Sequence, residues 1–197
     1  MDYLIAKPRS TSDIEMIADR IRETLNLKSN LYFPVINFIE NVLPNVDAGF
    51  NYEYVSKIDM PPNTYAYYNS TENVMYIRDD VYDAACMGDG RHRFTLAHEI
   101  GHYLLHSEGV CLSRSVNESE IKPYLNPEWQ ANTFASALLM PRSLIKSMTV
   151  KQIADECGTS FQAASIAYKK AESNNELSNH HFVQSKKLYQ QYIKLTI

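Results

Sequence analysis

Three histidines at regular spacing, with one glutamate among them, form the densest group of chemically versatile side chains in the sequence. In the stretch HEIGHYLLH, His98 and His102 stand four residues apart, Glu99 lies between them, and His106 follows after another four. Residues i and i+4 of a helix lie one turn apart on the same face, so His98 and His102 can direct one imidazole nitrogen each at a single ion. His106 lies about 12 Å from His98 along the helix axis, too far for one ion to contact all three. We interpret His106 as a packing residue or as a residue behind the ligands.

The spacing matches the H-E-x-x-H pattern, in which two histidines on a helix bind zinc and the glutamate acts as general base. Catalytic zinc takes three protein ligands and leaves one position to water. Glu99 is placed to take a proton from that water and to return it to a leaving amine. The alternative is a buried helix whose histidines hydrogen-bond to backbone. Gly101 costs the helix roughly 1 kcal/mol relative to alanine, which indicates either a close backbone or substrate strand or simple tight packing.

A third ligand has to come from elsewhere in the chain. The candidates are later carboxylates, namely Glu108, Glu118, Glu120 and Glu128. Glu128 is best placed because Asn126 can cap a helix that starts at Pro127, and the positive end of the helix dipole keeps a first-turn carboxylate ionised. One turn further on, Asn132 shares its face and is a candidate to hold the outer nitrogen of a ligand histidine.

The elements that position these residues are predicted from periodicity and capping. Ser12-x-x-Glu15 is a capping box ahead of an apolar helical pattern, and alternating residues over 49 to 78 predict a small antiparallel sheet with a hairpin at NSTEN. From residue 80 the pattern is helical again, and the histidine motif lies in a segment that begins near Arg91.

Two more capping boxes, Thr149-x-x-Gln152 and Thr159-x-x-Gln162, predict a helix-turn-helix-like pair over 149–171 with Gly158 at the turn. If the pair read DNA, its second helix would present Ser160, Gln162, Ser165 and Lys169. Only Lys169 and Lys170 are basic there, and three alanines, Ala163, Ala164 and Ala167, favour close packing on other helices. We interpret the pair as packed on the core and still able to dock a protein partner.

Composition sets the broad class. The 197 residues are 45% hydrophobic and 21% charged, as in a globular domain, and the net charge of −4 argues against sequence-independent binding to nucleic acid. The start of the chain does not resemble a signal peptide, and no apolar stretch approaches the ~18 residues that span a membrane, so we expect a cytoplasmic protein. The three cysteines, Cys86, Cys111 and Cys157, form no C-x-x-C pair and are expected to be buried thiols.

The stretches RHRFTLAHEIGHYLLH and EWQANTFASALLMP together resemble the ImmA/IrrE family of zinc metallopeptidases, and the likeness covers most of residues 10 to 170. The resemblance implies an α+β, mainly helical zincin-like fold with His98, His102 and Glu128 as zinc ligands and Glu99 as catalytic acid/base. It also implies a role, because members of this family cleave or inactivate helix-turn-helix repressors of phages and mobile elements, or act in stress responses. The peptidase domain is then expected over 1–171, followed by a linker and C-terminal segment of unknown role over 172–197.

Three functions remain open: a zinc peptidase acting on a protein such as a repressor, a DNA-binding regulator, and a protein-binding module with a silent zinc site. Zinc-dependent base deamination is disfavoured, because its H-x-E and P-C-x-x-C elements are missing. The sequence does not select a residue to stabilise an oxyanion. Tyr103 is expected to point away from the metal, and Tyr124, near Glu128, is a candidate for that role.

Overall fold

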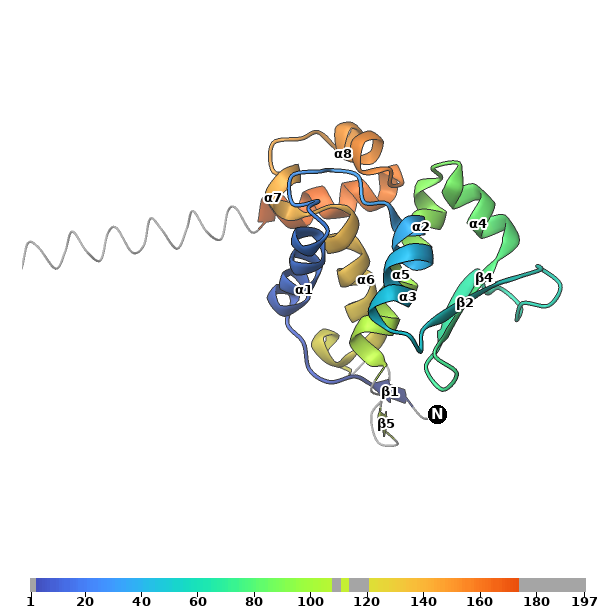
Figure 1. The fold of residues 1–197 in the computed structure, drawn as a ribbon. Helices are drawn as coiled ribbons and strands as arrows, with labels where there is room; N and C mark the ends of the chain where they lie inside the picture. Colours follow the sequence, from blue (N-terminus) through green and yellow to red (C-terminus); the bar gives the residue numbers. More distant parts are fainter. Residues whose placement is uncertain (1–2, 108–110, 114–120, 174–197) are drawn as a thin grey trace, which may run out of the picture.

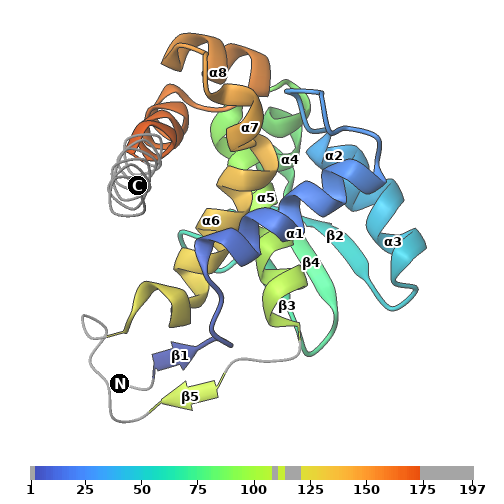
Figure 2. The same ribbon diagram turned by 90° about the vertical axis from the view of Figure 1, so that its left-hand side faces the viewer.

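Two helices, α5 (Gly90–His106) and α6 (Pro127–Leu139), lie side by side at the centre of the fold. Helix α1 packs on α6, and the small sheet lies on the opposite side of α5 (Figures 1 and 2). The structure is a computed structural model that describes residues 3–107, 111–113 and 121–173. The other elements, in chain order, are β1 (Tyr3–Ile5), α1 (Thr11–Thr24), α2 (Val35–Asn37), the π-helix η1 (Phe38–Val42), α3 (Leu43–Val46), β2 (Asn51–Val55), β3 (Ala66–Asn69), β4 (Val74–Arg78), α4 (Asp79–Cys86), β5 (Cys111–Ser113), the 3-10 helix η3 (Pro123–Leu125), α7 (Arg142–Ile145), α8 (Val150–Cys157) and a helix over 161–173.

Gly101 allows α5 and α6 to approach closely. A Cβ atom at this position would lie 3.0 Å from the Cα of Ala131 and 3.2 Å from Cδ1 of Phe134. Such contacts are tighter than ordinary van der Waals packing, so a side chain here would move α6. The close backbone that the mid-helix glycine predicts is therefore α6. Apolar side chains that are fully buried fill the core around this contact, including Leu96, Ile100, Phe134 and Leu138.

The three-stranded sheet has the order β2-β4-β3, and it is mixed. Strands β3 and β4 form the predicted antiparallel hairpin, with Ala66 opposite Ile77. The expectation of a wholly antiparallel sheet is wrong, because β2 runs parallel to β4, with Asn51 opposite Val74. The connection over 56–65 carries the chain from one edge of the sheet to the other, so β4 returns between its neighbours. An alternating pattern shows which face a residue occupies and not the direction of the strand.

The N-terminal segment runs along the start of α6. Strand β1 pairs with β5, and Ala6 N–H then donates to the carbonyl of Leu125 at 2.9 Å. The capping box of helix α1 lies earlier in the chain than predicted. It joins Ser10 and Asp13, and Ser12 and Glu15 lie inside the helix. Three hydroxyl residues, Ser10, Thr11 and Ser12, are adjacent here, and the position of Asp13 decides which of them becomes the cap.

The helix pair is anchored on the first turn of α5. The predicted cap Thr149–Gln152 is present at α8, whereas the following helix is capped by Ser160, whose Oγ accepts from Ala163 N–H at 3.1 Å, and not by Thr159. The buried Arg93 donates from Nε to the carbonyl of Gly158 at 2.8 Å, which fixes the turn between the two helices. Within the described ranges, no helix combines the length and apolar character needed to cross a membrane.

Gly90→Ala tests this anchoring. A Cβ at Gly90 would lie 2.2 Å from the carbonyl carbon of Thr159, which is backbone and cannot rotate away. We expect the substitution to lower the free energy of unfolding by about 1 to 3 kcal/mol, measured by urea denaturation.

Gly88→Ala is the matched control. Nothing lies within 4 Å of a Cβ there, and only the positive φ of 89° is penalised, at about 1 kcal/mol. A Gly90→Ala protein as stable as the wild type would show that the helix pair does not lie against the start of α5.

Candidate metal centre

Three side chains from the two central helices converge at one point. The Nε2 atoms of His98 and His102 lie 2.9 Å apart. Glu128 of α6 faces both, with Oε2 at 3.2 Å from His98 Nε2 and Oε1 at 3.3 Å from His102 Nε2. Among the residues that the structure describes, these three form a group whose ligand atoms all lie within 4.8 Å of one another.

The antiparallel course of α5 and α6 produces this convergence. His102 lies opposite Glu128 at the start of α6, and one turn back along α5, His98 lies opposite Asn132. Asn126 caps α6 by accepting from Trp129 N–H at 3.1 Å, with Pro127 in the first turn, as predicted. The first-turn carboxylate of Glu128 therefore lies at the positive end of the helix dipole.

The donor set fits zinc. Tetrahedral coordination with bonds of about 2.0 to 2.1 Å separates neighbouring ligand atoms by about 3.3 Å. The distances of 2.9, 3.2 and 3.3 Å among the two imidazole nitrogens and the carboxylate oxygens are close to that value. Two imidazoles and one carboxylate also leave the fourth position for water or substrate, as in catalytic zinc sites.

Each candidate ligand histidine makes a hydrogen bond through its outer nitrogen. His98 Nδ1 lies 3.1 Å from Asn132 Oδ1, so the nitrogen donates to the amide oxygen. This is the position predicted for Asn132. His102 Nδ1 lies 3.1 Å from Nδ1 of His106, which lies behind the ligand rather than among the ligands. Such outer contacts fix the tautomer and the ring orientation of a ligand histidine.

Gln130 determines where the protons lie in this chain of hydrogen bonds. Its Nε2 donates to the carbonyls of Lys7 at 2.9 Å and Tyr124 at 2.8 Å, so its oxygen faces His106 as an acceptor. His106 must then carry its proton on Nε2 and accept at Nδ1 from His102. Burial lowers the pKa of His106 to about 4, which keeps it neutral at pH 7 and able to accept. In its neutral form, His102 consequently presents an unprotonated Nε2 to the site.

The inner atoms of the site are therefore all acceptors. The outer bonds leave His98 and His102 with free lone pairs that face the carboxylate of Glu128, and a cation is needed to bring such groups together. In the metal-free site, protonation of His102 and His98 at Nε2 supplies hydrogen bonds that hold the pKa of Glu128 far below its usual range. Burial lowers the pKa of His98, but Glu128, Glu99 and Asn132 together outweigh it and raise the pKa overall. A proton and a metal ion thus compete for the same lone pairs.

Glu99 lies beside the three ligands and is itself buried. Its side chain is 8% exposed, and one carboxylate oxygen accepts from the backbone N–H of Tyr68, in β3, at 3.1 Å. Burial raises the pKa of Glu99, although His98 opposes the shift. A carboxyl group with a raised pKa exchanges protons more readily near neutral pH than a surface glutamate does.

The remaining sequence candidates either make side-chain contacts outside the group of candidate ligands or lie outside the described residues. Glu108, Glu118 and Glu120 belong to the latter group. Tyr103 donates its hydroxyl to Asp47 Oδ2 at 2.9 Å, and the ring of Tyr124 packs on Lys122. Sequence reasoning missed Gln130. The available signal was a large amide at a core-facing position of α6, where the side chain is 0% exposed.

Comparison with known protein families identifies one match. The model of the peptidase M78 family, described as the IrrE N-terminal-like domain, matches residues 56–167. No curated protein matches significantly. A solved structure of a Mycobacterium tuberculosis transcriptional regulator is 15% identical, with a TM-score of 0.49, and the match covers 77% of this chain and 45% of that one. The chain thus spans less than half the length of that regulator. The family match includes both central helices and extends over more than half of the sequence, so the chain belongs to the peptidase M78 family of IrrE N-terminal-like domains.

Proposed function

We propose that this protein is a zinc-dependent endopeptidase that cuts a protein substrate, of which a helix-turn-helix repressor of a phage, mobile element or stress regulon is the best candidate. The observation that carries the proposal is the convergence of two lone-pair nitrogens and one carboxylate beside a buried second carboxylate. The family supports peptidase activity in general. The choice of a repressor rests on the resemblance seen in the sequence.

His98, His102 and Glu128 would hold the zinc ion, which supplies a Lewis acid that activates water and polarises the peptide carbonyl. Glu99 accepts a proton from the attacking water at a carboxylate oxygen. After the carbon–nitrogen bond breaks, Glu99 delivers that proton to the leaving amine, so the residue starts and ends ionised. Tyr68 N–H keeps the carboxylate oriented during both transfers.

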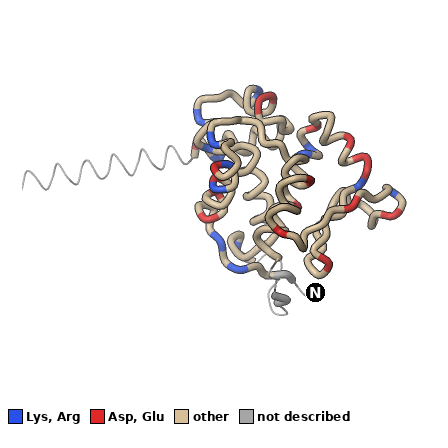
Figure 3. The backbone as a smooth tube through the Cα atoms, in the orientation of Figure 1, with Lys and Arg blue, Asp and Glu red and all other residues tan. Residues whose placement is uncertain are grey.

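The main alternative is a DNA- or protein-binding regulator that uses the helix pair 149–171 and carries a silent zinc site. Three alanines of the second helix, Ala164, Ala167 and Ala171, face the core. Helix α8 presents Asp155 and Glu156 next to Lys151, and acidic and basic positions are interspersed over much of the surface (Figure 3). Binding to duplex DNA requires a basic face, so these features favour the peptidase.

Glu99→Gln tests the catalytic step. We expect loss of cleavage by at least about 100-fold, because the amide cannot transfer the proton, with zinc content unchanged. The protein would be co-expressed with a repressor encoded beside it, fragments would be followed on gels, and zinc would be quantified in the purified protein. Equal cleavage by wild type and variant would rule out the proposed role of Glu99.

Glu128→Gln and His106→Gln test the assignment of the third ligand. Loss of a ligand carboxylate should weaken zinc binding by more than about 100-fold, whereas a change behind His102 should cost about tenfold. Competition with a chromophoric chelator measures both affinities. A larger loss in His106→Gln than in Glu128→Gln would contradict the assignment.

Gln130→Leu and Gln130→Glu test the chain of hydrogen bonds behind His102. Both variants lose the donor to Lys7 and Tyr124, but only the glutamate keeps an acceptor for His106. We expect zinc affinity to fall by up to about tenfold in the leucine variant and to remain closer to wild type in the glutamate variant. Nitrogen-15 NMR of the zinc-free wild type should show the proton of His102 on Nδ1. A proton found on Nε2 instead would disprove the inferred tautomer.

A further inference from the structure

A groove of about 310 Å³ lies between the first turns of α5, the later turns of α6 and the helix over 161–173. Its floor is formed by Phe94 and Thr95 of α5 with Asn132 and Ser136 of α6. The helix pair, which has no part in the candidate metal centre, contributes the opposite wall. The groove therefore gives this pair a possible task other than DNA binding.

The floor of the groove continues the helix faces that carry the candidate ligands. Thr95 lies three residues before His98 on α5, and Asn132 lies four residues after Glu128 on α6 while contacting His98. From His98 to Arg91 at the far end is about 10 Å along the helix, the length of roughly three residues of an extended peptide. A substrate chain whose scissile bond lies at the metal centre would reach this groove with its next few residues.

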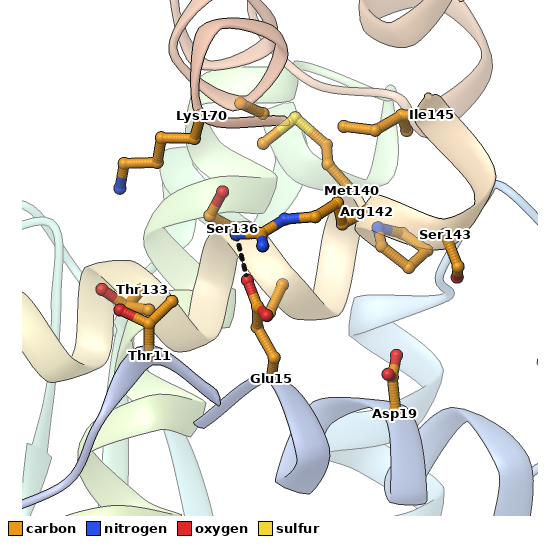
Figure 4. A pocket seen from close by; sticks show the side chains of 13 residues that line it. Thr11, Glu15, Asp19, Thr133, Ser136, Met140, Arg142, Ser143, Ile145 and Lys170 are labelled. Carbon is orange, nitrogen blue, oxygen red and sulfur yellow. Dashed lines mark hydrogen bonds and ion pairs between the residues drawn. The ribbon is translucent and has the colours of Figure 1, made fainter. Parts of the chain in front are cut away.

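The neighbouring cavity between α1, α6 and α7 does not offer the same opportunity. It measures about 70 Å³, enough for about two water molecules, and the ion pair between Arg142 and Glu15, at 2.6 Å, lies across it (Figure 4). Lys170 borders both spaces, and its side chain extends away from Met140 and Ile145 in this view. Of these two spaces, the groove is the one that suits a peptide.

The groove combines positive charge with apolar surface. Arg91 and Lys170 are the charged side chains among the described residues that line it, and none of those residues is acidic. Phe94 and Ile166 add apolar surface, and Ile166 is 50% exposed although its helix packs on the core through the opposite face. This local positive charge contrasts with the net charge of −4 of the whole chain. The positive charge of the groove complements an acidic side chain, and its apolar surface complements an apolar one. The groove therefore favours a ligand that carries both.

We propose that this groove binds the segment of the protein substrate next to the cleaved bond, and that it selects an acidic residue beside an apolar one within about four positions of that bond. The inference rests on the proposed peptidase function. It assigns Arg91 and Lys170 to the acidic side chain, and Phe94 and Ile166 to the apolar one. The helix pair is then a wall of the substrate site.

Peptide selection tests the groove without requiring cleavage. The Glu99→Gln protein, loaded with zinc and immobilised, would be offered a phage-displayed library of random peptides. We expect selected peptides to be enriched roughly three- to fivefold in Asp or Glu next to a large apolar residue. A general attraction by the acidic protein would enrich basic peptides instead. Selected peptides without an excess of Asp and Glu, or no selection above the bare support, would overturn the proposal.

Matched variants locate the selectivity. Joint Arg91→Glu and Lys170→Glu substitution should reverse the preference towards Lys and Arg. Lys146→Glu with Lys151→Glu makes the same change of charge at exposed positions outside the groove and should leave the acidic preference intact. An acidic preference that survives the first pair of changes would overturn the proposal.

Two further comparisons complete the test. Ile166→Ser should reduce the apolar preference, whereas Ile58→Ser, at a site 94% exposed and remote in sequence, should not. Removal of zinc with a chelator should leave the selection in place, because the groove is separate from the ligand atoms. Acidic selection together with equal cleavage by wild type and Glu99→Gln would support a peptide-binding groove and contradict the proposed function. Cleavage that depends on Glu99 without acidic selection would support the function and overturn the groove.

Discussion

The separation of the two central helices controls the geometry of the candidate metal centre. The donor atoms of α5 and α6 lie about 3 Å apart, and Gly101 allows this approach because a Cβ there would lie 3.0 Å from the Cα of Ala131. Any side chain at that position pushes α6 outwards and carries the carboxylate of Glu128 with it. Coordination bonds tolerate deviations of only a few tenths of an ångström, so the packing of one small residue sets the chemistry available to the site.

Buried polar side chains fix the loops onto the two central helices, α5 and α6. Arg93 holds the turn at Gly158, and Arg22 donates to the carbonyl of Leu138 at 2.7 Å at the end of α6. Gln130 does the same for the N-terminal segment, through the carbonyl of Lys7. Burying such groups is costly unless their hydrogen bonds are made, so each one specifies a single position for a loop. The two ends of the groove and the ring behind the metal ligand depend on these contacts.

Local signals in the sequence predict the parts of the site that lie on single helices. Helical spacing places His98 and His102 on one face, and a cap with a following proline locates Glu128 in a first turn, as the structure has it. The direction of β2 could not be predicted, because strand patterns describe faces alone. The role of Gln130 could not be predicted either, because it depends on hydrogen-bond partners that are distant in the sequence. The groove likewise depends on three helices that meet only in the folded chain.

The contact between Gln130 and Lys7 joins residues 123 positions apart. Closing so long a loop is entropically unfavourable and occurs late relative to the formation of single helices. The imidazole ring of His106, behind His102, is thus held in its final orientation only once the N-terminal segment has reached α6. During folding, α5 with its two candidate ligand histidines forms from local interactions, but the hydrogen bonds that orient His106 behind His102 await the contact between Gln130 and Lys7. Metal affinity would therefore rise late in folding and report that the chain has closed.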